Sequence, residues 1–294
     1  MYNTPILFII FANPDTTAQV FERIRQIQPA KLYVAADAPR PEKQGELQRS
    51  IDTKNIINRI DWNCELKTFF QDKNLGPKIA VSKAITWFFE HEEQGVILEH
   101  DCLPDPSFFP YCEELLEKYK DDARIGHISG HNTLLNVIDD DLSYDFRSYP
   151  HIWGWATWRR VWKNYDLNFS FWETCKKKRS FLFNNKWEEI YYSSFIPDVL
   201  FNKNGINTWD MQYGFTIRLQ NQLAICPVVN LVANIGIGDP NAVHTKKNNM
   251  KILSANAISF PLKHPQHFII NKKLDSKSIP FSWKRLARYF LKFY

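Results

Sequence analysis

Gly95-Val-Ile-Leu-Glu-His-Asp-Cys-Leu-Pro-Asp-Pro-Ser107 is the stretch around which the rest of the chain is organised. Its apolar start, Val96–Leu98, predicts a short buried strand that ends in the polar residues Glu99, His100 and Asp101. Ligands of open α/β sheets bind outside the carboxyl ends of the strands. We therefore expect this acidic cluster to lie where chemistry takes place.

Carboxylate and imidazole groups this close together can hold a divalent cation. The alternative is that Glu99 and Asp101 only cap the helix that the sequence predicts over 106–120. Aspartate is a good N-cap residue, but Asp105 already stands in that position, directly before Pro106. The metal-binding interpretation is therefore favoured over the capping one.

Strand and helix patterns alternate over the first 120 residues. Apolar runs predict three further strands, at Pro5–Phe11, Lys31–Ala36 and Cys64–Phe70, with helical spacing between them. Such alternation implies an α/β fold with a mostly parallel sheet, helices on both faces and right-handed crossovers. No GxGxxG follows the first strand and no GxxxxGKS or GxxxxGKT occurs, which argues against a dinucleotide-binding Rossmann domain and a P-loop NTPase.

The second half of the chain has a less regular pattern. Ile125–Ser129 predicts a strand, 132–150 a loop region, and the chain is expected to turn helical after Trp155. Residues 168–205 are polar, aromatic and basic, and no element is predicted there. Beyond them the sequence predicts a helix over Trp209–Asn221 and strands over Leu223–Cys226 and Val228–Ala233.

The composition of the 294 residues narrows the class of protein. Hydrophobic residues make up 44% and charged residues 23%, as in soluble globular proteins, and the 15% of aromatic residues suggest a stacking pocket besides the core. The net charge of +5 suits an anionic ligand or surface and is too small to indicate nucleic-acid binding. Five cysteines without a CxxC pair argue against a disulfide framework or a zinc site and favour a reducing compartment.

The amino terminus runs directly into the first predicted strand. It carries neither a basic leader nor a small-residue cleavage site, so this run predicts a strand rather than a signal peptide. No apolar run reaches the length of about 18 residues that a membrane span needs. We therefore expect a cytoplasmic protein.

Seven motifs follow one another in a specific order over residues 4–246. Together they resemble bacterial nucleotide-diphospho-sugar transferases of the GT-A fold, often labelled hemolytic-protein-like, which are similar to the N-acetylglucosaminyltransferase I group. The motifs are the first strand with Pro14-Asp-Thr-Thr17, Leu32-Tyr-Val-Ala-Ala-Asp37, Asn74-Leu-Gly76, Ile97-Leu-Glu-His-Asp101, Trp153-Gly-Trp-Ala-Thr-Trp-Arg159, Trp209-Asp210, and Asn234-Ile-Gly-Ile-Gly238 with His244-Thr245.

The resemblance implies a GT-A domain over 1–246, with a nucleotide-binding half (1–130) and a smaller, aromatic-rich acceptor and catalytic half (131–246). Residues 247–294 form a tail outside it, ending in a basic amphipathic helix. The implied activity is inverting transfer of a sugar from a nucleotide-diphosphate donor, a UDP-sugar, assisted by Mn²⁺ or Mg²⁺. The implied acceptor is a hydroxyl of a glycan or lipid-linked molecule in bacterial surface polysaccharide assembly.

The metal ligands follow from the same resemblance. Glu99-His100-Asp101 takes the place of the family's Glu-Asp-Asp, a form of the DxD motif. Asp101 would bind the metal, with Glu99 and His100 at the nucleotide, although His100 replaces the usual Asp and brings a softer, uncharged ligand. His244 resembles a histidine near the carboxyl end that reaches the metal or diphosphate. The alternative for His244 is an ordinary surface residue.

Three further residues are implied at the nucleotide. Asp37 would accept a hydrogen bond from the uracil ring, or else cap the loop that follows it. Lys78 stands at a helix start, which favours anions, so it would contact the diphosphate unless it is an ordinary first-turn lysine. Asn13 occupies a position near the nucleotide where relatives often carry Arg.

Asp210 is the candidate general base, which an inverting displacement needs to deprotonate the acceptor hydroxyl. The alternative is a plain helix N-cap. Trp153, Gly154 and Trp155 are candidate sugar and acceptor contacts, because indole faces stack on sugars and glycine admits a close backbone. For Trp158 and Trp162 the helix-core alternative is preferred.

The basic run at 176–179 is predicted to be a solvated face, and with the basic helix at 281–294 it could contact anionic lipid headgroups at the inner face of the plasma membrane. Two other functions compete with glycosyl transfer. A nucleotidyltransferase that makes the sugar nucleotide would want a glycine-rich loop after the first strand, and Phe11-Ala-Asn-Pro14 is not one. A catalytically degenerate sugar-nucleotide or glycan-binding module would explain His100 and Asn13.

Overall fold

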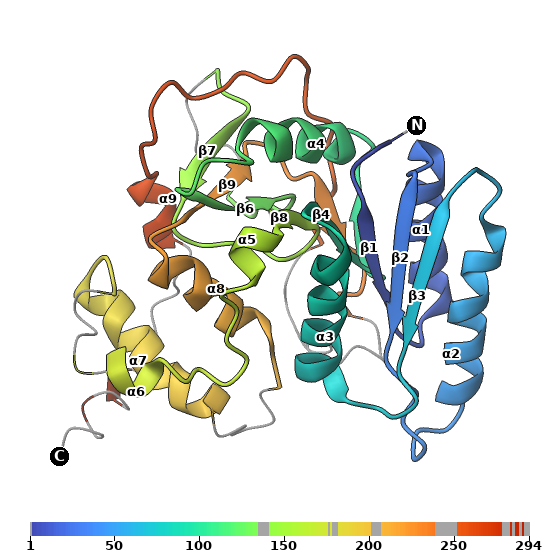
Figure 1. Cartoon of the computed structure of the whole chain (residues 1–294). Coiled ribbons are helices and arrows are strands. Elements are labelled where there is room, and N and C mark those ends of the chain that lie inside the picture. The colour runs from blue at the N-terminus through green and yellow to red at the C-terminus, as the bar shows by residue number, and fades with distance from the viewer. Residues whose placement is uncertain are drawn as a thin grey trace.

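The computed structural model describes residues 2–134, 141–175, 177, 182–200, 207–238 and 252–277, together with 283, 286, 287 and 290. Eight of its strands form one sheet (Figure 1). In spatial order they are β3 (Glu65–Phe70), β2 (Lys31–Ala36), β1 (Ile6–Ile10), β4 (Gln94–Glu99), β8 (Trp155–Trp158), β6 (Ile125–Ser129), β9 (Leu223–Pro227) and β7 (Tyr144–Arg147). The sheet therefore spans both predicted halves of the chain.

The strands β3, β2, β1 and β4 are parallel, which confirms the predicted α/β class. Helices α1 (Pro14–Ile27) and α2 (Glu46–Asn55), with the short 3-10 helix η1 (Ile56–Arg59), cover one face, and α3 (Gly76–His91) covers the other (Figure 1). Every residue of β1 is buried, as expected of a strand between two helix layers.

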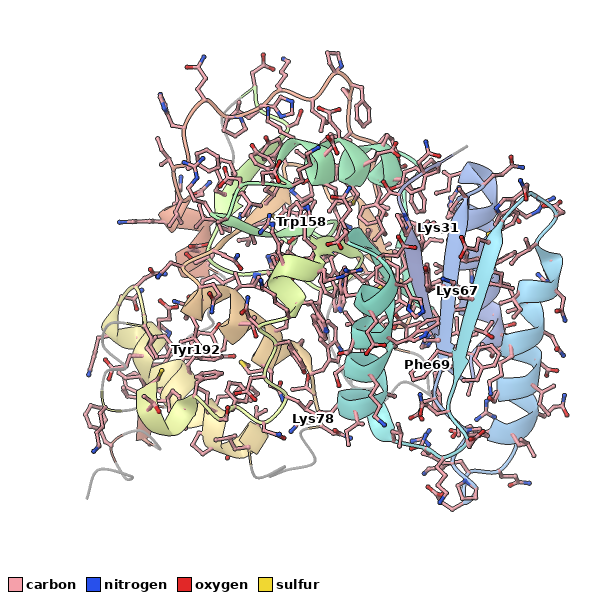
Figure 2. All side chains as sticks on the ribbon, viewed as in Figure 1. Lys31, Lys67, Phe69, Lys78, Trp158 and Tyr192 are labelled. Atoms are coloured by element: carbon pink, nitrogen blue, oxygen red, sulfur yellow. The ribbon has the colours of Figure 1, made fainter. Side chains whose placement is uncertain are left out.

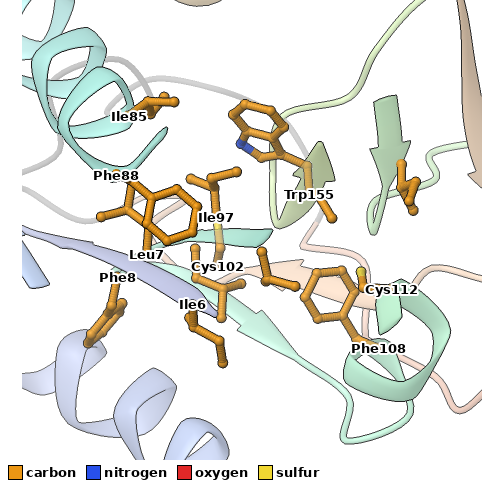
Figure 3. Close-up of a cluster of buried hydrophobic side chains, with 14 of the residues drawn as sticks. Ile6, Leu7, Phe8, Ile85, Phe88, Ile97, Cys102, Phe108, Cys112 and Trp155 are labelled. Carbon is orange, nitrogen blue, oxygen red and sulfur yellow. The ribbon is translucent and has the colours of Figure 1, made fainter. Parts of the chain in front are cut away.

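The core continues from this half into β8 and α4 (Phe108–Lys118). Figure 3 shows Phe88 of α3, Ile97 of β4, Phe108 of α4 and Trp155 of β8 in one buried cluster. The carboxylate of Asp105 accepts the Ser107 N–H at 2.9 Å and shapes the turn that leads into α4, while Ser107 itself is the N-cap. Glu99 and Asp101 are not used to cap this helix, so their capping alternative does not hold.

The prediction of a helix directly after Trp155 is wrong. Trp155–Trp158 is β8, antiparallel to β4 with Ala156 opposite Val96, and the short helix α5 (Arg159–Trp162) begins only at Arg159. The tryptophan spacing fits a helix, but β4 offers an open edge that a strand can pair with, and tertiary pairing overrides the local pattern. Trp158 and Trp162 are core residues, as predicted, although Trp158 lies in a strand.

Three further elements, β7 (Tyr144–Arg147), α6 (Trp172–Cys175) and α7 (Lys186–Leu200), were not predicted. The expected loop at 132–150 contains β7, which pairs with β9, and residues 168–205 contain α6 and α7. These two helices pack with α8 (Asp210–Leu219) around a second cluster, set apart from the sheet in Figure 1, with Tyr192 among its side chains in Figure 2. The cluster consists of Phe169, Trp172, Phe183, Ile196, Val199 and Phe215.

Residues 252–277, expected in a tail, pack against the sheet. The N–H of Ser143 donates to the carbonyl of Lys263 and that of Asn271 to Phe146, at 2.9 Å each, and α9 (Lys272–Lys277) contacts β7. Most of the predicted helix at 281–294 lies outside the described residues. Within the part of the chain that the structure describes, no helix is both long and apolar enough to span a bilayer.

Candidate functional site

The carboxyl ends of three neighbouring parallel strands lie side by side at one edge of the sheet. Ile10 of β1 pairs with Ala36 of β2, and Ile9 pairs with Glu99 of β4. The backbone N–H of His100 continues this ladder by donating to the carbonyl of Ile9 over 2.9 Å. The register therefore brings to one edge the predicted site residues that follow these strands, Asn13, Asp37 and Glu99–Asp101.

The carboxylate of Asp37, at the end of β2, is occupied by backbone donors. Its Oδ1 accepts the N–H groups of Ala38 and Leu75, and its Oδ2 accepts the N–H of Gly76, each at 2.9 Å. Because Gly76 begins α3, this carboxylate satisfies free helix donors and complements the helix dipole. The bond to Ala38 matches the alternative that Asp37 caps the loop that follows it, the bonds to the start of α3 were not predicted, and contact with uracil stays a prediction.

Asn13 and Lys78 lie at the starts of two helices at the same edge. The Asn13 side chain accepts the Thr16 N–H at 3.4 Å and so caps α1, with Pro14 in the first turn. Lys78 lies in the first turn of α3, and its side chain extends away from β1–β3 (Figure 2). Both stay predicted nucleotide contacts, and the position of Lys78 at a helix N-terminus suits an anion.

Glu99, His100 and Asp101 lead the chain out of β4, and all three are half-buried. Burial, with the charges of Asp101 and Asp210, raises the pKa of Glu99 to about 8. No Lys or Arg among the described residues forms an ion pair with these carboxylates. The acidic groups therefore repel one another without a neutralising side chain from this part of the protein.

Asp210 reaches this edge from a distant part of the sequence. It is the first residue of α8, and its Oδ1 accepts hydrogen bonds from the Thr208 hydroxyl and, at 2.9 Å, from the N–H of Met211. Its charge acts on Glu99, so both carboxylates share one electrostatic environment. Asp210 thus lies close enough to the end of β4 for its charge to act on Glu99, while its role as a base stays a prediction.

The turn at 234–238 covers Asp101. It follows β10 (Val232–Asn234), which pairs with β5 (Cys102–Pro104), and the N–H of Ile235 donates to the Asp101 carbonyl at 2.8 Å. A Cβ on Gly236 would lie 2.5 Å from Asp101 Oδ2, so glycine is needed for this close approach. The glycine-rich motif therefore lies against the Glu-His-Asp motif. His244, the other predicted metal ligand, lies outside the described residues.

Trp153 and Trp155 have opposite surroundings. Trp153 is half-buried, whereas Trp155 has no exposed surface and its ring packs against His127 and Trp209, with centroids 5.2 and 5.8 Å apart. The prediction that Trp155 contacts a sugar is therefore wrong, because no face of its indole is accessible. Gly154 between them has a φ of +63°. Trp153 and Gly154 stay predicted sugar contacts.

A divalent cation fits the donor set at the end of β4. Carboxylate oxygens suit Mg²⁺ and Mn²⁺, and the unneutralised repulsion of Glu99, Asp101 and Asp210 favours positive charge there. Over the described segments, no group of three or more His, Cys, Asp and Glu side chains is arranged to hold a metal ion alone. Mg²⁺ commonly takes one or two carboxylates and completes its shell with phosphate oxygens and water. Asp101 and Glu99 therefore suit an ion that binds together with a diphosphate.

Several residues of this region were not predicted from the sequence. Asn207 borders the start of α3, since a Cβ on Gly76 would lie 2.9 Å from its Nδ2, and the Tyr165 hydroxyl donates to the carbonyl of Trp209 at 3.1 Å. His131 packs on Trp153 with ring centroids 4.5 Å apart. It could have been suspected, because it follows a predicted strand and a glycine.

Comparisons with known proteins give a partial structural likeness. No protein-family model matches the chain, and no curated protein matches it significantly. UDP-glucose pyrophosphorylase in its apo form is 11% identical, with 80% of this chain and 93% of that one covered and a TM-score of 0.42. HddC from Yersinia pseudotuberculosis is also 11% identical, covering 57% and 83% at a TM-score of 0.33.

A third solved structure, the inositol-1-phosphate CTP transferase from T. maritima, is 10% identical, covering 58% of this chain and 76% of that one at a TM-score of 0.34. By their names, UDP-glucose pyrophosphorylase and the CTP transferase are nucleotidyltransferases. At such identities and TM-scores the likeness assigns no function to the chain.

Proposed function

We propose that the chain is a transferase acting on a nucleotide-linked sugar, and specifically a metal-assisted inverting glycosyltransferase. The observation that supports this is that the charges of Asp101 and Asp210 both act on Glu99, at the carboxyl edge of the sheet. One pair of carboxylates follows a strand where α/β folds bind ligands. The third carboxylate, Asp210, comes from the separate helix α8. A base that deprotonates the acceptor must likewise approach from a different side than the metal ligands.

Each residue has a defined role in this proposal. Asp101, with Glu99, would hold Mn²⁺ or Mg²⁺, which when bound neutralises charge on the departing diphosphate. Asp210 takes the proton of the acceptor hydroxyl while that oxygen bonds to the anomeric carbon and the bond from that carbon to the diphosphate oxygen breaks. Lys78 supplies positive charge near the diphosphate. The donor is a UDP-sugar and the acceptor a glycan or lipid-linked hydroxyl.

Donor hydrolysis tests this function without knowledge of the acceptor. The protein is incubated with Mn²⁺ and UDP-glucose, UDP-galactose or UDP-N-acetylglucosamine, and UDP release is measured. We expect slow metal-dependent release with one donor, lost in Asp210→Asn while that donor still binds. Asp52→Asn, an exposed carboxylate of α2, is the matched control. Full turnover by Asp210→Asn would contradict the assigned base.

Nucleotidyl transfer is the second candidate, and the class of the compared neighbours agrees with it. The chain would then join a nucleoside triphosphate and a sugar 1-phosphate with release of pyrophosphate. Against it, the loop after β1 lacks glycine, and its Asn13 is used to cap α1. Pyrophosphate release from UTP and glucose 1-phosphate, without UDP release from UDP-sugars, would favour this candidate. Metal-independent UDP-sugar binding with neither activity would instead favour a binding module.

The same proposal places residues 281–294 at an anionic membrane surface. Trp283 and Phe290 are 74% and 53% exposed and stand seven positions apart, a spacing that would place them on one side of the helix that the sequence predicts there. Basic residues lie between them in the sequence, and each contributes about 1 kcal/mol near anionic lipid. The chain should sediment with phosphatidylserine vesicles more than with phosphatidylcholine vesicles, and deletion of 281–294 should remove the difference. Equal sedimentation would contradict it.

A further inference from the structure

His131 and Trp153 form a pair beside the acidic cluster. The N–H of Gly130 donates to the carbonyl of Gly154 at 2.7 Å, which holds the segments of these two residues together. A Cβ on Gly154 would lie 3.3 Å from the side chain of Leu98, the residue before Glu99. The pair therefore borders the end of β4 rather than a remote part of the fold.

The protonation of the His131 ring follows from its contacts. Its Nδ1 lies 3.1 Å from the carbonyl of Val232, and because a carbonyl can only accept, Nδ1 carries the hydrogen. Burial lowers the pKa of His131 and outweighs the hydrogen bonds with the Val232 carbonyl and the Asn230 side chain, which raise it, so the ring is neutral. Its Nε2 is therefore an unprotonated acceptor.

This acceptor has no partner among the residues that the structure describes. The His131 side chain is only 4% exposed, and its Nε2 is buried and makes no hydrogen bond there. An unpaired buried acceptor costs about 1–3 kcal/mol, and native proteins contain few of them. A ligand that donates a hydrogen bond would remove this cost.

The surroundings indicate what kind of ligand. The indole of Trp153 stays half-buried against the His131 ring, at an interplanar angle of 59°, while Trp155 is sealed in the core. A partly accessible indole offers an apolar face, and the imidazole beside it offers one acceptor. A sugar ring matches both, because its C–H groups pack on indole and its hydroxyls donate.

We propose that Trp153 and His131 form a hydroxyl-recognising sugar subsite, in which Nε2 of His131 accepts a hydrogen bond from one hydroxyl of the sugar stacked on Trp153. This rests on the proposed use of a nucleotide-linked sugar and applies to glycosyl and nucleotidyl transfer alike. His131 is then a specificity residue, which acts on the sugar and not on the nucleotide.

The test compares UDP with UDP-sugars on the full chain. Calorimetric affinities for UDP, UDP-glucose, UDP-galactose and the 2-, 3-, 4- and 6-deoxy analogues of UDP-glucose are measured with Mn²⁺ present. The wild type should bind one deoxy analogue about tenfold more weakly than the parent sugar, the effect of one lost hydrogen bond. His131→Phe should bind UDP as the wild type does and lose this discrimination.

Two further variants keep the test decisive. Should His131→Phe fail to fold, Trp153→Ala, at a half-buried position, is expected to remove the gain in affinity that the sugar adds to UDP. His127→Phe is the matched control, because both nitrogens of that buried histidine are already paired, with the Tyr213 hydroxyl and the His151 carbonyl. Its discrimination should equal that of the wild type.

The outcomes separate the subsite from the proposed function. Wild-type turnover with unchanged discrimination in both His131→Phe and Trp153→Ala would overturn the subsite alone. No binding of any UDP-sugar and no turnover by the wild type would overturn the proposed function and the subsite with it. Binding of Zn²⁺ alone that disappears in His131→Phe would assign Nε2 to a metal, as imidazole can serve, and would also overturn the subsite.

Discussion

Two sets of carboxylates stand at the same edge of the sheet with opposite surroundings. Asp37, after β2, accepts three backbone N–H groups and holds the start of α3. Glu99 and Asp101, after β4, have no Lys or Arg partner among the described residues. The negative charge of Asp210 also acts on Glu99. The first set supports the fold, whereas the second concentrates negative charge that the protein leaves for a ligand to neutralise.

The difference shows that position at a strand end does not define function by itself. Helix donors satisfy an acidic group and stabilise the fold, whereas acidic groups that repel one another are a cost to stability that binding can relieve. Substitutions in the two sets should therefore have different effects. Changes to the carboxylates after β4 should reduce activity, whereas changes to Asp37 after β2 should reduce stability.

Asp101→Asn should give the largest effect. Loss of the metal-binding charge is expected to reduce donor turnover at least about 100-fold, which corresponds to about 2.7 kcal/mol. The melting temperature should be unchanged or higher, since repulsion with Glu99 falls. Turnover and thermal unfolding are measured on the same preparation, and near-normal turnover would place the metal elsewhere.

Asp37→Ala should destabilise the protein by about 1–2 kcal/mol, because the first N–H groups of α3 lose their acceptor. Asp37→Asn keeps an oxygen acceptor and should cost less. Urea unfolding measures both. Equal stability of the wild type and Asp37→Ala would remove the contrast between the two sets.

Gly236→Ala should raise the Mn²⁺ concentration needed for half-maximal activity about tenfold, equivalent to about 1.4 kcal/mol. The added Cβ would stand 2.5 Å from Asp101 Oδ2, so the carboxylate or the turn must shift. Gly214→Ala in α8 is the matched control, because its Cβ would meet nothing nearer than 4.0 Å. A similar change in both variants would refute the covering role of the turn.

Glu99→Gln should change how stability depends on pH, with the smallest effect of the four because the side chain is partly exposed and solvent screens it. The pKa of Glu99 is about 8 in the folded protein and about 4.5 in the unfolded chain. Between these values the unfolded chain releases a proton that the folded protein keeps, so wild-type stability falls as pH rises.

Glu99→Gln lacks this titration, so its melting temperature should exceed that of the wild type increasingly from pH 5 to pH 8. Added Mn²⁺ should narrow the gap at pH 8. Parallel melting curves for the two proteins across this range would show that Glu99 is not held in a repulsive cluster.

Much of the amino-terminal half, which contains the parallel strands β1–β4, could be predicted from the sequence. The runs that became β1, β2 and β4 are short, continuous and apolar, and helical spacing separates them, so local pattern alone indicates buried strands joined by helices. The position of the candidate site could also be predicted, because parallel strands place their carboxyl ends at the same edge of the sheet. Glu99 and Asp101 were therefore found by reading what comes after the fourth strand, whereas the resemblance to a known family pointed to Asp37.

The second half was less predictable because its elements depend on distant partners. Trp155–Trp158 has a spacing that fits a helix, yet it pairs with the open edge of β4. The helix α7 buries Ile196 and Val199 against α6 and α8 without a regular apolar stripe, so periodicity did not reveal it. Trp153 and Trp155 likewise could not be distinguished from the sequence pattern, and only their burial shows that Trp155 is a core residue.

The sequence by itself determined the α/β class and the acidic end of β4, because both follow from short-range patterns of apolar and polar residues. Only the tertiary structure decided that Asp210 shares an electrostatic environment with Glu99, that the turn at 234–238 covers Asp101, and that His131 packs on Trp153. Such contacts join segments far apart along the chain, and they arise from packing and strand pairing that no local period records.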